Sequence, residues 1–313
     1  MEKSQSLVLS DSMDVSIIIV NYNTKELTAH CIDSVYEKSE GIDFEIILVD
    51  NASSDGSREY FQNDSRITYI YNDENLGFGR ANNRGLEVAK GRDILFLNSD
   101  TLLVNNAVKI LVDYLRENPS VGACGGNLYD EDMQPAISYR RYFPGIREEL
   151  NNLCFHLPER VFCRKMRVHN CTQQPLKVAY ICGADLMIRR AVLEQVGAFS
   201  EDFFMYYEET DLCFRIHKAG YDITSVPQAC IQHLEGKSFK SIFDANRLVI
   251  SEKGRAVFYR RNYPSWYYRV ANCIAWIALT VHPMIYRLFG YREAAGACKT
   301  RRAALRHIRK TSK

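Results

Sequence analysis

The chain has 313 residues, 46% of them hydrophobic and 25% charged, a composition that is typical of a globular protein and excludes a disordered or collagen-like chain. The chain has 40 Lys/Arg and 38 Asp/Glu residues. Residues 260–313 contain 12 of the basic residues and 1 of the acidic ones, so residues 1–259 contain 28 basic and 37 acidic residues. A basic segment of net charge +11 therefore follows an acidic body of −9, which favours contact between that segment and an anionic surface, either membrane or nucleic acid.

The length allows one large domain or one domain with an appendage. Ten cysteines without any Cys-x-x-Cys pair indicate reduced core residues rather than a disulfide framework. The first 14 residues have no long apolar core and no small-residue cleavage pattern, so we expect no secretory signal and a cytoplasmic protein.

Four short apolar runs without a helical period predict strands that are buried on both faces. They are residues 15–20 (VSIIIV), 44–49, 67–71 and 94–97 (ILFL). Asn23 and Glu26 have the form of a capping box for a first helix, and further helices are expected at about 81–89 and 107–117. This alternation predicts βαβ units in a right-handed, mostly parallel sheet that is flanked by helices.

Aromatic and polar residues follow three of these strands. Tyr22 follows the first, Asp50 and Asn51 follow the second, and Asp100 ends the turn after the fourth. In a doubly wound sheet these loops line one crevice. An aromatic face, hydrogen-bonding groups and a carboxylate suit a nucleotide, with a divalent cation between Asp100 and its diphosphate. The alternative is that the Asp and Asn residues only build turns.

Glycine spacing argues against two other classes of nucleotide-binding protein. Gly77, Gly79 and Gly85 do not form a G-x-G-x-x-G motif, which disfavours a dinucleotide dehydrogenase. No G-x-x-x-x-G-K-[ST] sequence occurs, which removes a P-loop ATPase.

Residues 127–177 are more basic and aromatic than the rest of the body. They are interpreted either as a surface that faces a phosphorylated or sugar acceptor or as a solvated loop. By residue type a zinc site could be assembled there from Cys154, His156, Cys163, His169 and Cys171. Their spacing fits no common zinc pattern, so a zinc site is disfavoured.

Five motifs in a fixed order carry a specific resemblance. They are VSIIIVNYN, VDNASSDGS, NLGFGRANNRG, FLNSDT and FFMYYEETDLCFR, followed by His233. Over about residues 14–240 the chain resembles the inverting family-2 glycosyltransferases, which have the GT-A fold, and within them the rhamnosyltransferase-like branch. The resemblance implies an α/β, GT-A (Rossmann-like) domain, here with a C-terminal helical, basic extension.

The resemblance implies a metal site and a catalytic base. Asp100 matches the last acid of the family's Asp-x-Asp metal motif, whose first position is Asn98 here. His233 matches a second metal ligand. Glu208 and Glu209 match an acidic pair whose second member is the base, so Glu209 is the expected base and Glu208 is the alternative.

The resemblance also implies the surfaces that bind the two substrates. The nucleoside-diphosphate sugar donor is expected at Val20, Tyr22, Asp50, Asn51, Asn75, Gly77, Phe78, Arg80, Asn83, Asn98 and Ser99. The acceptor side is expected to include Gly183, Ala184 and Asp185.

These roles agree with the chemistry of the residue types. A divalent cation on Asp100 and His233 would neutralise charge on the leaving diphosphate; Mg²⁺ prefers oxygen ligands, and a His ligand makes Mn²⁺ equally plausible. A carboxylate at a helix start can accept the proton of an attacking hydroxyl. The structural alternatives are a helix-terminal charge for Glu209 and a core histidine for His233.

Residues 270–281 (VANCIAWIALTV) are apolar, and His282-Pro283 is expected to interrupt them. The run is short for a spanning helix, which needs about 20 apolar residues. Because aromatic residues precede it and residues 292–313 are basic, we expect it to lie in a membrane interface. A packing or homo-oligomer face and a true span are the alternatives. Nucleic-acid binding is not expected, since no nucleic-acid module is visible.

The expected domains are a GT-A domain at residues 1–258, with a nucleotide-sugar half at about 14–126 and an acceptor half at about 127–258, and a membrane-associating tail at 259–313. The expected activity is inverting transfer of a sugar to a glycan or lipid-linked glycan in cell-surface polysaccharide synthesis, at the inner face of the cytoplasmic membrane. The resemblance favours dTDP-rhamnose as donor. UDP-hexose donors, a nucleotidyltransferase and a non-catalytic sugar- or partner-binding module are the alternatives.

Overall fold

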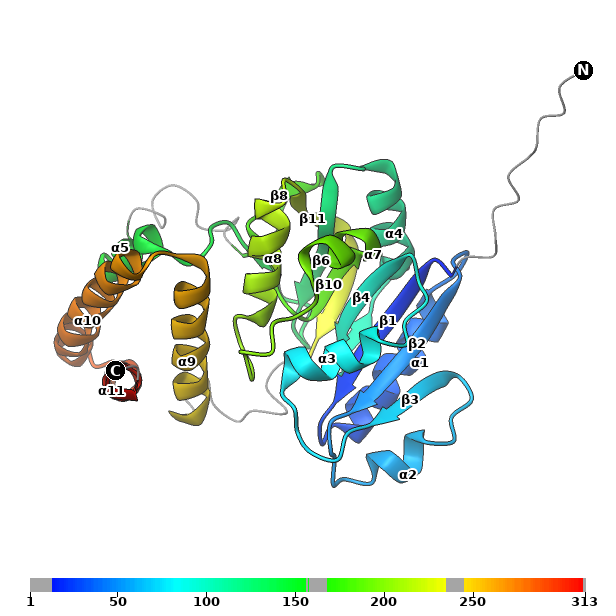
Figure 1. The fold of residues 1–313 in the computed structure, drawn as a ribbon, viewed down its shortest axis with the longest axis horizontal. Coiled ribbons are helices and arrows are strands. Elements are labelled where there is room, and N and C mark those ends of the chain that lie inside the picture. The colour runs from blue at the N-terminus through cyan, green and yellow to red at the C-terminus, as the bar shows by residue number, and fades with distance from the viewer. Residues whose placement is uncertain (1–12, 156, 158–167, 235–244, 312–313) are drawn as a thin grey trace, which may run out of the picture.

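A computed structural model describes residues 13–155, 157, 168–234 and 245–311 of the chain. Within them, the main sheet has the strand order β3-β2-β1-β4-β10-β6-β11-β5, with β8 paired to β11 (Figure 1). The strands of this sheet are β1 (Val15–Asn21), β2 (Phe44–Asp50), β3 (Ile67–Tyr71), β4 (Asp93–Asn98), β5 (Thr101–Leu103), β6 (Val121–Tyr129), β8 (Leu176–Lys177), β10 (Asp185–Arg189) and β11 (Asp222–His233). A separate two-stranded sheet pairs β7 (Tyr139–Arg140) with β9 (Tyr180–Ile181).

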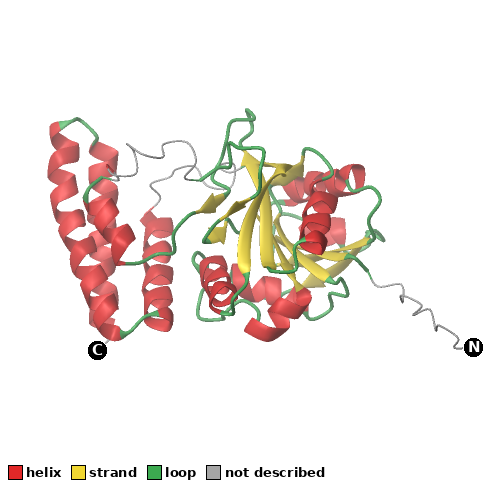
Figure 2. Ribbon diagram, turned by 90° about the horizontal axis from the view of Figure 1, so that it is seen from above, coloured by secondary structure: helices red, strands yellow, loops and turns green. Residues whose placement is uncertain are grey.

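Helices cover both faces of the main sheet and continue into a C-terminal helical unit (Figure 2). They are α1 (Lys25–Lys38), α2 (Ser57–Phe61), α3 (Phe78–Leu86), α4 (Ala107–Glu117), α5 (Ile146–Leu153), α7 (Arg190–Val196), α8 (Glu208–Lys218), α9 (Ala245–Asn262), α10 (Ser265–Leu288) and α11 (Arg292–Thr311). The expected α/β fold, a mostly parallel sheet between helices, is confirmed.

Two hydrophobic clusters, one on each face of the main sheet, explain why the first strands are apolar along their whole length. Ile17 and Ile19 of β1 face a cluster that α1, α2 and α4 complete, whereas Ile18 faces a second cluster with α3, α7 and α8. Phe96 of β4 belongs to the second cluster and Leu97 to the first. Both faces of β1 and β4 are therefore buried, as their continuous apolar runs predict. Strand β3, at the edge of the sheet, is only partly buried, so the same prediction is wrong for residues 67–71.

The parallel order ends at β4. Strands β3, β2, β1 and β4 are parallel, but β10 is antiparallel to both β4 and β6. Strand β11 is parallel to β6 and antiparallel to β5. The βαβ prediction therefore holds for the N-terminal half, while the C-terminal half of the sheet is mixed.

Three local predictions differ from the structure. Helix α1 begins after Thr24 and shows no side-chain cap, so the capping box expected at Asn23 is wrong. Asn23 instead accepts the backbone N–H of Ser54 and has a positive φ. Helix α3 begins at Phe78, three residues before the expected start, because glycine at 77 provides its N-terminal turn.

The third difference is that α10 runs without a break through Pro283. A proline inside a helix removes one backbone hydrogen bond. Pro283 and His282 are both buried, and His282 Nε2 lies 3.2 Å from the carbonyl oxygen of Leu153 at the end of α5. Packing against α5 therefore holds the helix together across the proline.

A buried ionic network connects the C-terminal helices to the body. Arg255 of α9 donates to Glu149 of α5 at 2.8 Å and to Glu252 at 2.9 Å. Its second terminal nitrogen donates to Asn272 of α10, and Arg301 of α11 donates to Glu252 at 2.6 Å. The domain boundary expected after residue 258 thus falls inside α9. This helix packs against elements on either side of that boundary.

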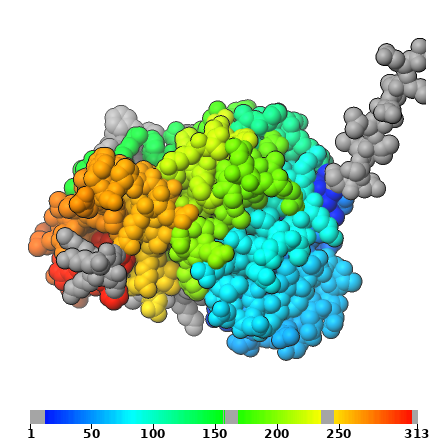
Figure 3. All heavy atoms as spheres, in the orientation of Figure 1, coloured from blue at the N-terminus to red at the C-terminus, as the bar shows by residue number. Residues whose placement is uncertain are grey.

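Residues 265–311 form the end of the molecule that lies farthest from strands β1–β3 (Figure 3). Among the described helices, none combines the length and the apolar character that crossing a bilayer requires.

Replacing Arg255 with alanine is expected to destabilise the protein by about 3–5 kcal/mol, because Glu149 then loses its buried cation and Glu252 loses one of two. Thermal unfolding followed by circular dichroism measures the change. The matched control is Arg84→Ala, whose side chain is 50% exposed and is expected to change stability by less than about 0.5 kcal/mol. Equal melting temperatures for the two variants would contradict a structural role for the network.

Candidate active site

The turn after β4 and the end of β11 form the centre of the candidate site. His233 pairs with Thr101 across the β11–β5 ladder, which brings it beside the turn that contains Asp100. His233 Nε2 lies 3.2 Å from Asp100 Oδ1 and 3.3 Å from Asn98 Nδ2. The two residues that the sequence predicts as metal ligands are therefore adjacent, although 132 positions separate them in the chain.

The donor atoms of Asp100 and His233 fit a divalent cation that also binds a substrate. In the described part of the chain, no three or more His, Cys, Asp or Glu side chains are arranged so that they alone could hold a metal ion. One carboxylate oxygen and one imidazole nitrogen would leave several coordination positions for phosphate oxygens and water. This donor set suits Mn²⁺ and can hold Mg²⁺.

The structure gives no support to the disfavoured zinc site. His156 and Cys163 lie outside the described residues. His169 is buried, and its Nδ1 lies 3.3 Å from the carbonyl oxygen of Ala136.

Ser99 connects the turn after β4, which contains Asp100, to the loop after β1. Its hydroxyl lies 3.0 Å from Thr24 Oγ1, which in turn donates to Asn21 Oδ1 at 2.8 Å. Ser99 is nearly buried, so its main effect in this structure is to hold the two strand ends together. Val20, the last apolar residue of β1, pairs with Asn98 in the ladder.

Asp50 and Asn51, which were expected to contact the nucleotide, are both buried in this structure. Asp50 accepts the backbone N–H of Ser53 at 2.9 Å and the hydroxyl of Tyr69 at 2.8 Å. Asn51 Nδ2 donates to Asn75 Oδ1 at 2.8 Å. Through these contacts both residues shape the strand-end loops, as the turn-building alternative proposes.

Tyr22 is the residue at this edge that is free to meet a planar ligand, because 48% of its surface is exposed. It follows β1 directly, at the carboxyl edge of the sheet where ligands bind in open α/β folds. The predicted stacking surface is therefore accessible.

The Gly77–Phe78 turn packs directly on the segment that precedes the acidic pair. Gly77 has φ +82°, and a Cβ on it would lie 2.1 Å from the carbonyl oxygen of Phe204. That same oxygen accepts the backbone N–H of Phe78 at 2.9 Å. Only glycine fits at this position, because a side chain would collide with backbone.

Arg80 and Asn83 also bind the segment before the acidic pair. Arg80 donates through Nε and Nη2 to the carbonyl oxygen of Glu201, at 3.1 and 2.8 Å. Asn83 makes a two-way pair with the backbone of Phe199. Both residues were expected to contact the donor, and in this structure they position the second half of the domain against the first.

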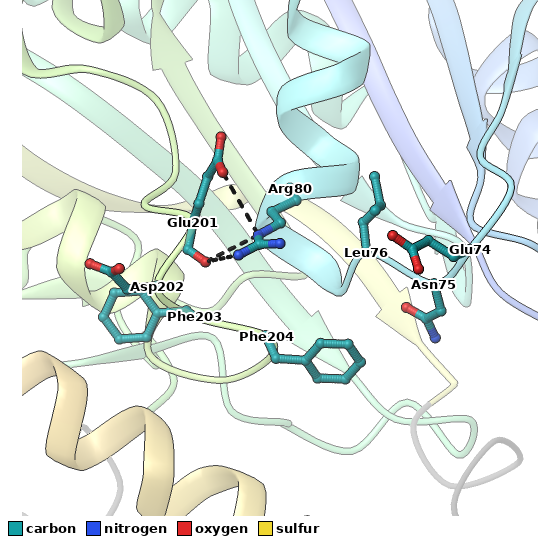
Figure 4. Close-up of a pocket in the computed structure, with 8 residues that line it drawn as sticks. All are labelled: Glu74, Asn75, Leu76, Arg80, Glu201, Asp202, Phe203 and Phe204. Carbon is teal, nitrogen blue, oxygen red and sulfur yellow. Dashed lines mark hydrogen bonds and ion pairs between the residues drawn. The ribbon is translucent and has the colours of Figure 1, made fainter. Parts of the chain in front are cut away.

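A pocket of about 310 Å³ opens between these two segments (Figure 4). Arg80 and Glu201 close one side of it, and the ring of Phe204 extends toward the side on which Asn75 lies. The residues that line it are Glu74, Asn75, Leu76, Arg80, Glu201, Asp202, Phe203 and Phe204.

The acidic pair begins α8 after two residues in the left-handed backbone region. Tyr206 has φ +69° and Tyr207 has φ +76°, values that non-glycine residues rarely adopt. Gly254 of α9 lies against this turn, because a Cβ on it would be 2.4 Å from the Tyr206 carbonyl oxygen. Helix α9 therefore supports the backbone from which Glu208 and Glu209 project.

Glu209 lies beside Gly183, which was expected on the acceptor side. A Cβ on Gly183 would lie 3.7 Å from both Glu209 Cβ and Phe78 Cε1. The neighbouring Ala184 carbonyl accepts the backbone N–H of Asn98 at 2.9 Å. Gly183 and Ala184 therefore link the two parts of the site. Glu209, the expected base, lies beside Gly183, and Ala184 binds Asn98 at the start of the turn that contains Asp100.

Asp185, which was expected on the acceptor side, is fully buried. It accepts the backbone N–H of Gly126 on β6. Burial raises the pKa of Asp185 well above its usual value.

The two glutamates at the start of α8 differ in their surroundings. Glu208 is buried, and its Oε2 has no hydrogen-bond partner among the described residues. Burial, together with the charge of Glu209, raises the pKa of Glu208 well above its usual value. Burial also raises the pKa of Glu209, while backbone N–H groups and the Thr210 hydroxyl oppose the rise. Of the two, Glu208 is the more deeply buried, and Glu209 accepts the Thr210 hydroxyl.

Comparisons with known proteins assign the family. The sequence model of "Glycosyl transferase family 2" matches residues 16–197, more than half of the chain. The chain belongs to glycosyl transferase family 2. Membership of this family disfavours the nucleotidyltransferase alternative.

Two relatives show how far the similarity extends. The chain is 31% identical over 221 residues to a low-salt glycan biosynthesis hexosyltransferase of Haloferax volcanii. That alignment covers 67% of this chain and 64% of the relative. The chain thus spans less than two thirds of that relative. It is 26% identical over 235 residues to an N-acetylglucosaminyl-diphospho-decaprenol L-rhamnosyltransferase of Mycobacterium tuberculosis, covering 71% and 76%.

Solved structures support the GT-A glycosyltransferase fold. A mannosyltransferase from Pyrobaculum calidifontis in complex with GDP-Man and Mn²⁺ has a TM-score of 0.56 at 17% identity, over 94% of this chain and 88% of that one. GalNAc-T7 with UDP, GalNAc and Mn²⁺ has a TM-score of 0.54 at 15% identity, over 90% and 59%. Both neighbours carry Mn²⁺.

Several residues that shape the site had no signal in the sequence. Gly254 stands in a helix, where nothing marks it as a contact of the acidic turn, and the positive φ of Tyr206 and Tyr207 is unexpected for aromatic residues. Within α8, Arg215 donates to Asp211 four residues earlier, at 3.0 Å.

Gly254→Ala is expected to lower kcat for sugar transfer at least tenfold with little change in the KM of the donor. The added methyl group collides with the Tyr206 carbonyl and must displace the turn that carries the acidic pair. Steady-state kinetics measure both constants. Gly296→Ala on α11 is the matched control, since nothing lies within 4 Å of its Cβ position. Unchanged kcat in Gly254→Ala would refute the support role of α9.

Proposed function

We propose that this protein is an inverting glycosyltransferase that moves a sugar from a nucleoside-diphosphate donor to a glycan or lipid-linked glycan acceptor in cell-surface polysaccharide synthesis. The favoured donor is dTDP-rhamnose. The observation that carries the proposal is the contact between Asp100 and His233 at the strand ends, with Glu209 connected to the same turn through Gly183 and Ala184.

The donor is proposed to lie across the carboxyl edge of β1, β2 and β4. The exposed ring of Tyr22 would stack on the base, while Asp50 and Asn51 keep the surrounding loops in place. A Mg²⁺ or Mn²⁺ ion on Asp100 and His233, when bound, would supply positive charge at the leaving diphosphate.

Glu209 is proposed as the base on the acceptor side. The acceptor hydroxyl oxygen forms a bond to the anomeric carbon while the bond from that carbon to the diphosphate oxygen breaks, and the hydroxyl proton moves to the Glu209 carboxylate. Attack from the face opposite the leaving group inverts the configuration. Glu208, buried with a raised pKa, is proposed to stay protonated and to support Glu209 without accepting the proton.

The two relatives support the class of donor and acceptor. The mycobacterial relative is named for rhamnosyl transfer to a lipid-diphosphate-linked sugar, and the archaeal relative for glycan biosynthesis. We carry both properties over as proposals, because the identity is 26–31% and the alignments leave part of each chain uncovered. A lipid-linked acceptor also agrees with the proposed location, peripheral on the inner face of the cytoplasmic membrane.

A thermal-shift screen tests the proposed function directly. The purified protein is heated with dTDP-rhamnose, UDP-glucose, UDP-galactose, UDP-N-acetylglucosamine or GDP-mannose, each with and without Mn²⁺ or Mg²⁺. A ligand that binds only the folded state raises the melting temperature. A metal-dependent rise with dTDP-rhamnose is expected. A rise with another donor would replace the proposed sugar, and no rise with any donor would favour a non-catalytic binding module.

The two glutamates make separate predictions. Glu209→Gln is expected to lower kcat by about 10²–10⁴-fold, because the amide cannot accept the proton of the acceptor hydroxyl. Glu208→Gln is expected to keep kcat within a few-fold, because a protonated glutamate and a glutamine are nearly isosteric and both neutral. Initial rates of transfer measure the effect. The opposite ranking would assign the base to Glu208.

The pH profile is expected to report the raised pKa of Glu209. A base must be ionised, so the rate falls as the pH drops through the folded-state pKa, which lies above the ordinary glutamate value of about 4.3. The acid limb of kcat against pH is therefore expected above that value, and Glu208→Gln is expected to leave it in place. An acid limb at or below pH 4 would contradict a buried base.

A further inference from the structure

The outer face of α10 carries a continuous row of exposed apolar side chains. The row, called the docking stripe here, consists of Trp266, Val270, Cys273, Ile277, Val281, Met284 and Leu288. Successive members are three or four residues apart, so they share one face of the helix. Phe289 and Tyr291 extend the stripe beyond the end of α10. It is about 33 Å long at 1.5 Å per residue.

The described part of the protein does not cover the stripe. Exposure along it rises from 40% at Val281 to 65% at Met284 and 83% at Leu288. The opposite face of α10 is buried against α5 and α11, with Ala275 and Leu279 in the contact. Figures 1 and 2 place α10 at the end of the molecule away from the strands. A row of this size is unusual on a surface that meets only water.

Arginines flank the stripe on one side. Arg269 and Arg287 are exposed and each follows a member of the stripe by three residues, which places both on the same flank. Trp276 lies on that flank too, and the guanidinium groups of Arg302 and Arg306 on α11 lie over its ring at 5.8 and 5.1 Å from the centroid. An apolar face with cationic residues along its edge matches an interface between acyl chains and anionic headgroups.

We propose that the docking stripe is the surface by which this glycosyltransferase binds an anionic lipid bilayer, with α10 lying in the plane of the membrane. The inference deepens the proposed action on a lipid-linked acceptor, yet its own support is the stripe and its arginines. Charge decides between a bilayer and a second copy of the chain. Residues 260–313 carry +11, so self-association through this face would bring like charges together, whereas anionic lipid would neutralise them.

Co-sedimentation with vesicles tests the stripe without donor, acceptor or metal. Full-length protein is expected to bind vesicles of phosphatidylcholine mixed with phosphatidylglycerol, and to bind pure phosphatidylcholine at least tenfold more weakly. The double variant Ile277→Ser with Met284→Ser is expected to lose at least tenfold in affinity, because it removes two exposed apolar side chains that the bilayer would bury at the acyl boundary. The matched control is Val88→Ser with Val104→Ser, two exposed apolar residues of the body.

A second pair of variants separates charge from apolar contact. Arg269→Gln with Arg287→Gln is expected to weaken binding to the anionic vesicles by about 25-fold, about fivefold for each arginine, and to change binding to phosphatidylcholine little. Arg84→Gln, an exposed arginine of α3, is the control.

Two results would overturn the proposal. One is equal vesicle binding by the wild type, by Ile277→Ser with Met284→Ser, and by Arg269→Gln with Arg287→Gln. The other is a wild-type dimer that light scattering shows to become monomeric in Ile277→Ser with Met284→Ser, with vesicle binding unchanged, since the stripe would then cover a second copy. Because no step of the assay involves sugar transfer, an inactive enzyme that still binds vesicles would contradict the proposed function alone.

Discussion

The structure depends on a reversal of the chain directly after β4. Residues 98–101 turn the backbone so that β5 leaves antiparallel to β11, and this pairing sets Thr101 opposite His233. Asp100 then meets His233 at 3.2 Å. Asp100 and His233 come from different halves of the domain. The residues next to either one in the sequence therefore could not predict this contact. Asp100 and His233 meet because the mixed half of the sheet closes against the parallel half.

The second half of the site is connected to the C-terminal helices. Gly254 of α9 packs on the turn that presents Glu208 and Glu209, and the buried Arg255 next to it binds α5 and α10. Helix α10 in turn carries the docking stripe. The elements that would contact a membrane and the elements that hold the base therefore share one packed helical unit, which suits an enzyme whose acceptor is proposed to be anchored in lipid.

The sequence was sufficient for elements whose pattern is local. Apolar runs without helical period gave the four parallel strands, and the residues after them identified the edge that holds Tyr22 and Asp100. It was insufficient where tertiary contacts decide. The polarity of Asp50 and Asn51 suggested ligand contact, but burial directs both at the protein. Pro283 indicated a break that packing on α5 prevents.

We propose that Asp100 and His233 jointly hold the cation to which the donor diphosphate binds. Isothermal titration of dTDP and UDP into the wild type, Asp100→Asn and His233→Gln, with and without Mn²⁺, tests this role of the two side chains. Mn²⁺ is expected to strengthen nucleotide binding at least tenfold in the wild type, and each variant is expected to lose this gain while binding without Mn²⁺ stays alike. A gain from Mn²⁺ that survives in both variants would show that neither side chain holds the cation.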